Sequence, residues 1–144
     1  MTPDLELLSD VGASFLQRCE SGHWCLEATQ VRGNHVVARV GDTVVGTLSF
    51  TYENNRMQSR GTLVAAKYRR RGIGTMLWRK AIEWKCPTTI YASYVSDGGL
   101  RLTARMRALF PKVEWVLYDD RGDRFSRAAA RAWRGALRAG RSKV

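Results

Sequence analysis

Apolar and polar residues follow two different spacings along the chain, and the spacing changes from one stretch to the next. Apolar residues that recur every three or four positions predict a helix, and runs rich in β-branched and aromatic residues predict a strand. By these rules helices are predicted over residues 5–18, 72–85, 97–110 and 126–139, and strands over residues 35–40, 43–50, 61–66, 88–95 and 113–118. The order is helix, hairpin, strand, helix, strand, helix, strand, helix. It predicts an α/β fold with a mixed central sheet flanked by helices.

Turn and stop signals divide these elements. Gly41-Asp42 lies between two β-branched runs and predicts a β-hairpin, and residues 53–56 (Glu-Asn-Asn-Arg) predict a second turn. Pro87 and Pro111 end the two central helices. The apolar face expected on the first of them is Ile73, Leu77, Ala81 and Trp84, and that on the second is Leu102, Met106, Leu109 and Phe110.

Composition limits the class of protein. The 144 residues suit a single domain spanning the whole chain, with no repeat or linker to divide it. No apolar run approaches the ~20 residues of a membrane span, and the acidic and mixed residues after Met1 lead us to expect no signal peptide. The three cysteines are scattered and only two histidines accompany them, so no metal site is expected. Reduced thiols and a cytoplasmic location are the expectation.

Positive charge changes this picture, because it is large and uneven. The net charge is +11; residues 1–100 hold 12 basic and 9 acidic side chains, whereas residues 101–144 hold 12 and 4. One face of the last predicted helix carries Arg127, Arg131, Arg134 and Arg138. Such a surface favours polyanionic partners, either coenzyme A phosphates or a nucleic acid, although charged helix faces are often only solvated.

The most informative segment runs from Leu63 to Leu77, where a strand passes through a basic, glycine-bearing turn into a helix. Backbone N–H groups at such a helix start converge on one point at the positive end of the dipole, which suits a phosphate or diphosphate. Gly72 and Gly74 leave the backbone open to close approach, and Arg69, Arg70 and Arg71 add charge. The spacing matches neither a P-loop nor a dinucleotide fingerprint. An ordinary turn with surface arginines is the alternative.

Within this segment, Arg69-x-x-Gly72-x-Gly74 resembles the Arg/Gln-x-x-Gly-x-Gly/Ala signature of GNAT (GCN5-related) acyltransferases, with the strand before it and the helix after it that those proteins have. The similarity spans residues 34–118. It implies a GNAT-like fold with an extra Arg-rich C-terminal helix, and transfer of an acyl group from acetyl-CoA or another acyl-CoA to an amine by direct attack.

The resemblance also implies a cofactor site, whose residues are Val64, Ala65, Ala66, Arg69, Arg70, Arg71, Gly72, Ile73, Gly74 and Thr75. Amides from Arg70 to Thr75 would hold the diphosphate. Val64 and Ala66 would pair with the pantetheine arm, and the amide of Val64 or Ala65 would polarise the thioester carbonyl.

Proton transfer is less well specified, because the Asn and the helix Tyr that GNAT enzymes often carry are absent between Ser96 and Phe110. Tyr118 and Tyr94 are candidate proton donors, each also readable as a strand aromatic. Asp97 is a candidate acid or a helix N-cap. Glu53 is a candidate general base acting through water, or an exposed turn carboxylate.

Three hypotheses for the function follow, two of them enzymatic. The first is an amine acetylated by an ordinary GNAT enzyme. The second is a nucleic-acid acceptor, as in phage Mom proteins, which resemble GNAT enzymes and modify adenine in DNA, or in toxin-like members that act on charged tRNA. Four tryptophans, Trp78, Trp84, Trp115 and Trp133, would suit stacking on exposed bases. The third is a non-enzymatic nucleic-acid binder whose glycine loop grips a backbone phosphate.

Overall fold

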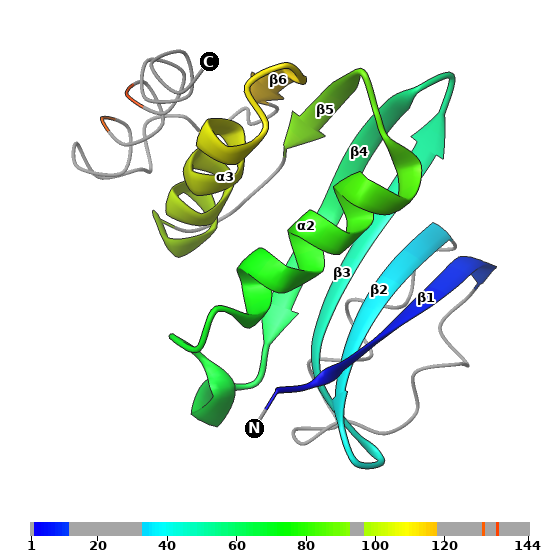
Figure 1. The fold of residues 1–144 in the computed structure, drawn as a ribbon, viewed down its shortest axis with the longest axis vertical. Helices are drawn as coiled ribbons and strands as arrows, with labels where there is room; N and C mark the ends of the chain where they lie inside the picture. Colours follow the sequence, from blue (N-terminus) through cyan, green and yellow to red (C-terminus); the bar gives the residue numbers. More distant parts are fainter. Residues whose placement is uncertain (1, 12–32, 93–96, 118–130, 132–134, 136–144) are drawn as a thin grey trace.

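The computed structural model describes residues 2–11, 33–92 and 97–117, together with residues 131 and 135. In this part of the chain six strands form one mixed sheet in sequence order. The strands are β1 (Asp4–Val11), β2 (Gly33–Val40), β3 (Thr43–Glu53), β4 (Arg56–Val64), β5 (Thr89–Ala92) and β6 (Glu114–Leu117). A short 3-10 turn, η2 (Ala66–Tyr68), leads into helix α2 (Ile73–Lys85), and helix α3 (Asp97–Leu109) joins β5 to β6 (Figure 1).

The sheet has an antiparallel half and a parallel half. Strands β1 to β4 are antiparallel neighbours with long registers, and β4, β5 and β6 are parallel. The parallel pairing of β4 with β5 extends only from Arg56↔Thr89 to Gln58↔Tyr91. The remainder of β4, up to Val64, therefore has no ladder partner on its β5 side among the described residues, and the sheet opens there.

Local chemistry explains the β3–β4 hairpin. Asn54 and Asn55 both have positive φ, 52° and 63°, the conformation of a two-residue type I′ turn that asparagine tolerates. The Asn55 carbonyl accepts hydrogen bonds from the amides of Thr88 (2.8 Å) and Thr89 (3.4 Å), which fixes the hairpin tip against the start of β5.

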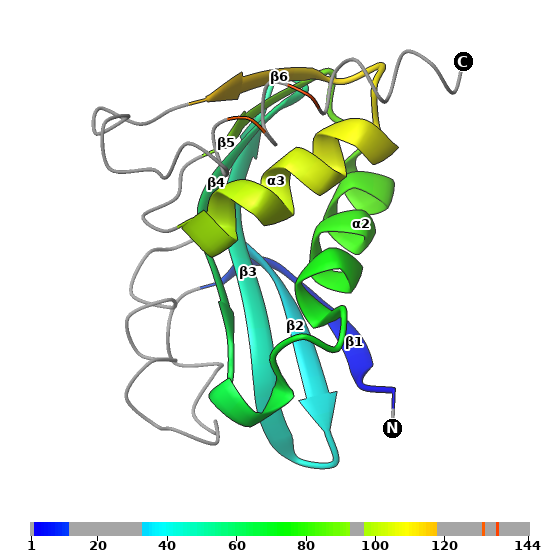
Figure 2. The ribbon, with the colours of Figure 1, turned by 90° about the vertical axis from the view of Figure 1, so that its left-hand side faces the viewer.

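The main core lies between the sheet and the two helices, which cover the same side of it (Figure 2). Phe50, Met57 and Ile90 from three adjacent strands are buried against α2. The Trp78 indole packs beside Trp115, with ring centroids 6.0 Å apart, and donates to Thr62 Oγ1 at 2.9 Å. A buried aromatic of this kind needs a partner for its N–H, and the hydroxyl of β4 supplies it.

The helix face predicted for α2 is confirmed, since Ile73, Leu77 and Ala81 are buried and Trp84 packs partly against the core. The stripe predicted for α3 is partly wrong. Met106 is buried and Leu102 and Phe110 pack partly buried against the core, as predicted, but Leu109 is 37% exposed. Leu100 and Ala104, outside the predicted stripe, are buried as well.

The helix predicted over residues 5–18 is wrong over its first part, because Asp4–Val11 is strand β1, paired antiparallel with β2 from Asp4↔Arg39 onward. A short apolar run cannot separate strand from helix by spacing alone. Pairing with β2 decides the outcome, and the Glu6–Arg39 ion pair (2.7 Å) joins the two strands at their surface. Residues 12–18 lie outside the described part.

The other strands were predicted with inexact ends. β4 begins at Arg56, five residues before the predicted start, because this polar stretch still alternates in burial: Met57 and Ser59 are buried, Gln58 between them is half-buried, and Arg56 and Arg60 are exposed. β5 and β6 lie within their predicted ranges, but residues 93–96 and 118 are outside the described part.

The C-terminal helix predicted over residues 126–139 also lies outside the described part, apart from positions 131 and 135. No helix among the described residues is both long and apolar enough to cross a membrane. Within those same residues, no group of three or more His, Cys, Asp or Glu side chains is placed to hold a metal ion.

Candidate active site

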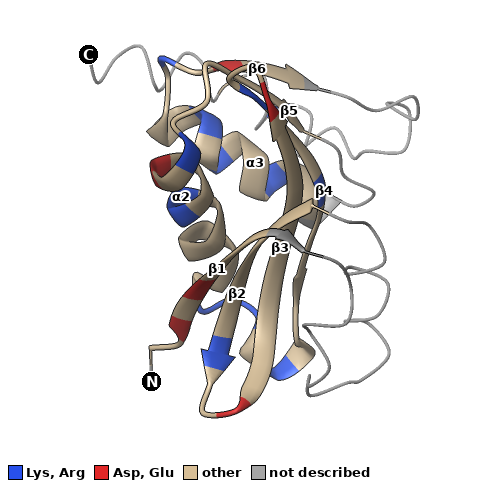
Figure 3. Cartoon of the chain, turned by 90° about the vertical axis from the view of Figure 1, so that its right-hand side faces the viewer, with Lys and Arg blue, Asp and Glu red and all other residues tan. Residues whose placement is uncertain are grey.

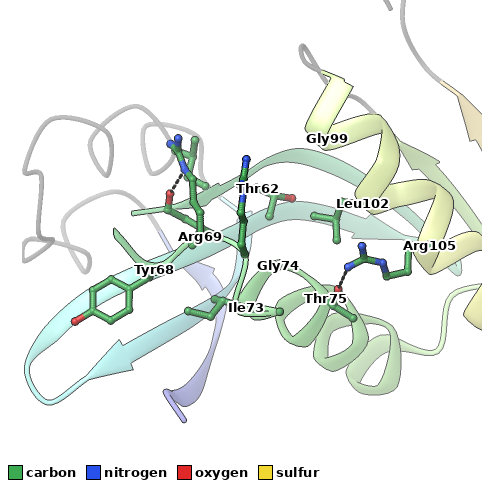
Figure 4. Close-up of a pocket in the computed structure, with 13 residues that line it drawn as sticks. Thr62, Tyr68, Arg69, Ile73, Gly74, Thr75, Gly99, Leu102 and Arg105 are labelled. Atoms are coloured by element: carbon green, nitrogen blue, oxygen red, sulfur yellow. Dashed lines mark hydrogen bonds between the residues drawn. The ribbon is translucent and has the colours of Figure 1, made fainter. Parts of the chain in front are cut away.

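A cavity of about 640 Å³ lies where β4 parts from β5. Thr62 and Val64 line it from the strand, Arg69 to Thr75 contribute most of the loop and the first turn of α2, and Gly99, Leu102 and Arg105 close it from α3 (Figure 4). The predicted cofactor residues Val64, Arg69, Arg70, Gly72, Ile73, Gly74 and Thr75 therefore line one cavity. Ala65, Ala66 and Arg71 do not line it, although they belong to the same connection.

The loop presents backbone donors to this cavity. Arg70 and Gly72 have positive φ, 63° and 80°, so the chain turns sharply twice before α2 begins. Gly72 is the N-cap of α2 and supplies no side-chain hydrogen bond to the first turn. The amides of Ile73, Gly74 and Thr75 precede the first intrahelical bond, Met76 N–H to Gly72 O at 3.0 Å. The arrangement suits an anion.

The two glycines of the motif have different roles. A Cβ at Gly72 would meet nothing within 4 Å, so this glycine is needed for its left-handed φ of 80°. A Cβ at Gly74 would lie 2.9 Å from Leu102 Cδ2. The missing side chain at Gly74 thus makes room for α3, in addition to any room it leaves for an anion.

The structure separates the two amides proposed to polarise a thioester. The Ala65 N–H donates to Val45 O at 2.8 Å and is engaged in the β3–β4 ladder. Because successive residues in an antiparallel pair point to opposite sides, the Val64 amide faces away from β3. The Val64 carbonyl confirms this side, since it accepts from Arg69 Nε at 3.0 Å across the cavity wall (Figure 4). Val64 is therefore the better candidate.

Cations surround the cavity, as the predicted loop indicated, but one of them was missed. Arg69, Arg70 and Arg105 line it, and Arg71 instead lies over the Tyr68 ring at 5.4 Å. Arg105 reaches from α3 and donates to Thr75 Oγ1 at 3.2 Å. Sequence spacing could not have found Arg105, because it belongs to a helix 30 residues further along the chain.

The acid–base candidates are not gathered in this cavity. Tyr94 and Tyr118 lie outside the described residues. Asp97 is the first residue of α3, two positions before Gly99 at the cavity wall. Glu53 is exposed at the far end of the hairpin, opposite Arg56, and Arg56 is eight positions or roughly 25 Å of strand from Val64.

Glu53 lines a second, smaller cavity of about 340 Å³, which Thr51, Arg56, Gln58 and Tyr91 also line. The register places Thr51, Gln58 and Tyr91 side by side on three strands, and Glu53 beside Arg56 in the next row. Met57 and Ile90, which alternate with them, are buried, so this polar surface is the sheet face opposite α2.

Most of the predicted nucleic-acid surface lies outside the described residues. Arg131 is exposed, and Arg127, Arg134 and Arg138 lie outside the described residues, as does Trp133. Trp78 and Trp115 are buried at 1% and 8% exposure, so the expectation that they stack on bases is wrong. Trp84 packs edge-on against Phe50. Basic residues lie on both α2 and α3, α2 also carries the acidic Glu83, and β1 carries acidic residues (Figure 3).

Comparison with known families gives a match to the acetyltransferase (GNAT) family over residues 6–87, more than half of the chain. Among curated proteins, none matches. The matched range contains the hairpin, β4, the glycine loop and α2, which are the elements that build most of the larger cavity.

Solved structures provide the fold comparison. A GNAT-family acetyltransferase from Streptococcus pneumoniae TIGR4 is 14% identical, with a TM-score of 0.53 over 82% of this chain and 98% of that one. An "IAA acetyltransferase" from Bacillus cereus ATCC 14579 is 25% identical, with a TM-score of 0.42 over 59% of this chain and 59% of that one. The first of these establishes the GNAT-like fold.

Proposed function

This chain belongs to the acetyltransferase (GNAT) family, and we propose that it transfers an acetyl group from acetyl-CoA to a primary amine in the larger cavity. One observation carries the proposal: the open edge of β4 and the free first turn of α2 border the same 640 Å³ space. A strand edge suits an amide-bearing arm, and a helix start suits a diphosphate. Acyl-CoA has both groups, and supplies the acyl thioester when bound.

The residues divide the work of holding that molecule. The first-turn amides from Ile73 to Thr75 donate to the diphosphate, with Arg69 and Arg70 beside them. The C=O of Val64 pairs with the arm along the open edge of β4, and its N–H is left for the thioester carbonyl. The Arg69 bond to the Val64 carbonyl leaves one lone pair of that oxygen available.

Catalysis rests on positioning and on the Val64 amide. The amine nitrogen forms a bond to the thioester carbon, the C–S bond breaks, and the carbonyl oxygen is stabilised by the Val64 N–H as negative charge develops. The amine loses a proton to solvent or a base, and the sulfur gains one. Tyr118, with Tyr94 second, is our proposed donor, since a phenol with its ordinary pKa of about 10 stays protonated at neutral pH.

Asp97 is the next candidate for the acid, because α3 begins there and contributes Gly99 to the cavity. Glu53 is the weakest candidate for the base, because it lies at the hairpin tip, where it lines the smaller cavity and is far from Val64.

The decisive experiment supplies isotope-labelled acetyl-CoA and separated small-molecule, protein, RNA and DNA fractions of a host cell. Mass spectrometry of each fraction identifies the acetylated product. Label appearing on an amine in any fraction supports the proposal. Binding of acetyl-CoA in native mass spectrometry without any transferred label contradicts the enzymatic part, and absence of binding contradicts the whole.

A second candidate makes the acceptor part of a nucleic acid, as in DNA modification or transfer to a charged tRNA, in the cytoplasm. The net charge of +11 supports it, with 12 basic and 4 acidic residues after position 100. In the fractionation experiment this candidate requires the label on RNA or DNA. Tight nucleic-acid binding without acetyl-CoA binding would instead indicate a non-enzymatic binder.

A further inference from the structure

Arg105 occupies an unusual place on α3. It is exposed, it lines the larger cavity, and its Nη1 donates to Thr75 Oγ1 at 3.2 Å (Figure 4). Thr75 belongs to the first turn of α2, where the backbone donors converge. Among the described residues no carboxylate pairs with Arg105, and no acidic side chain lines the cavity. A guanidinium bound only to a neutral hydroxyl keeps most of its donors for an anion.

The packing of α3 holds Arg105 in this position. Leu102, one turn earlier, fits against Gly74, where no Cβ could be accommodated without a shift. Ala104 and Met106, on either side of Arg105 in sequence, are buried. The backbone at Arg105 is therefore fixed against α2, and the hydrogen bond to Thr75 directs its guanidinium to the first turn of that helix.

We propose that Arg105 binds the diphosphate of acyl-CoA. The diphosphate would then accept hydrogen bonds from a side chain of α3 and from backbone amides at the start of α2. The inference rests on the proposed function. The diphosphate is favoured over other parts of the molecule because Thr75 places the guanidinium at the helix start. At neutral pH an acyl thioester carries no charge, which leaves the phosphates as the anions to be bound.

Calorimetric titration tests this with two probes, acetyl-CoA and acetyl-3′-dephospho-CoA, which share the diphosphate and differ in the 3′-phosphate. The variants are Arg105→Gln and the matched control Arg101→Gln, an exposed arginine one turn earlier that does not line the cavity. We expect Arg105→Gln to weaken both probes equally, by about 10- to 100-fold for a lost charged hydrogen bond. Arg105→Lys should recover part of the loss, and Arg101→Gln should change little.

Each other outcome overturns the inference. A loss with acetyl-CoA that disappears with the dephospho probe would assign Arg105 to the 3′-phosphate. Equal binding by Arg105→Gln and the parent would make the Thr75 contact merely structural, as would a loss that Arg101→Gln reproduces. If the parent binds neither probe, the proposed function itself fails, which distinguishes the two. Equal melting temperatures of the variants exclude unfolding as the cause.

Discussion

The two ends of β4 present opposite kinds of cavity. At its carboxyl end the strand has no partner on one side, and three arginines and free helix-start amides surround about 640 Å³. At its amino end it is paired on both sides, and the smaller cavity of about 340 Å³ combines Glu53 with Arg56. A polyanion such as acyl-CoA suits the first and is opposed by the carboxylate of the second.

From this difference we infer that anion binding in this protein depends on backbone freed from pairing more than on the number of basic residues. Basic side chains occur at both ends of β4, but the carboxyl end adds the first-turn amides of α2, which have no hydrogen-bond partner among the described residues. Substitutions at the two ends of β4 and elsewhere test this inference.

The largest effect is expected for Gly74→Asp. A carboxylate beside the first-turn amides removes favourable contacts with the diphosphate and adds repulsion, so acetyl-CoA affinity should fall about 1,000-fold or more by calorimetry. Gly74→Ala is the matched control, because any Cβ must displace the Leu102 side chain by a few tenths of an ångström. If Asp binds as well as Ala, and both melt like the parent, the anion lies elsewhere.

Features of the fold that depend on neighbouring residues could be predicted from the sequence, and features that depend on distant residues could not. The glycine loop, α2 and the β2–β3 hairpin were predicted correctly, because neighbouring residues such as Gly41 and Gly72 determine them. The strand nature of Asp4–Val11 and the approach of Arg105 depend on partners about 30 residues away, so no local pattern contains them.

The same limit applies to the sites. The loop residues could be proposed from the sequence because the donors they offer are consecutive backbone amides. The engagement of the Ala65 amide with Val45, and the separation of Glu53 from Val64, follow from strand pairing. Pairing of β-strands brings together residues whose spacing in sequence has no fixed period.

The second largest effect is expected for Tyr118→Phe. Loss of a positioned acid typically lowers turnover by about 100-fold or more, whereas acetyl-CoA affinity should be unchanged. Tyr91→Phe serves as the control from the smaller cavity and should retain the parent's turnover. Full turnover in both Tyr118→Phe and Tyr94→Phe would remove the tyrosines from the reaction and leave Asp97 or water as the donor.

A smaller effect is expected for Arg131→Ala combined with Arg138→Ala. These changes should weaken nucleic-acid binding and reduce the slope of log affinity against log salt by up to about 2 units, near 0.9 for each phosphate contact in duplex DNA. Acetyl-CoA affinity should stay constant. Arg79→Ala with Arg101→Ala removes the same charge from exposed sites on α2 and α3. An equal slope in the parent and both double variants would mean that the C-terminal arginines are solvated and do not contact phosphates.

The smallest effect is expected for Glu53→Gln. Because Glu53 lies at the hairpin tip, far from Val64, turnover should change less than about threefold, and the pH dependence of turnover should not change. A general base would instead be worth about 100-fold or more. A loss of that size in Glu53→Gln that is absent in Glu53→Asp would place the Glu53 carboxylate in the reaction centre.

The contrast between the two ends can be measured in one titration, by following the backbone amide resonances of the ¹⁵N-labelled protein as acetyl-CoA is added. We expect the largest shifts at Val64 and at the amides from Gly72 to Thr75, where the open strand edge meets the start of α2. The amides of Asn54 and Asn55, at the hairpin tip, should not move. Shifts concentrated at the hairpin tip, with the loop unchanged, would contradict the assignment of the cofactor to the larger cavity.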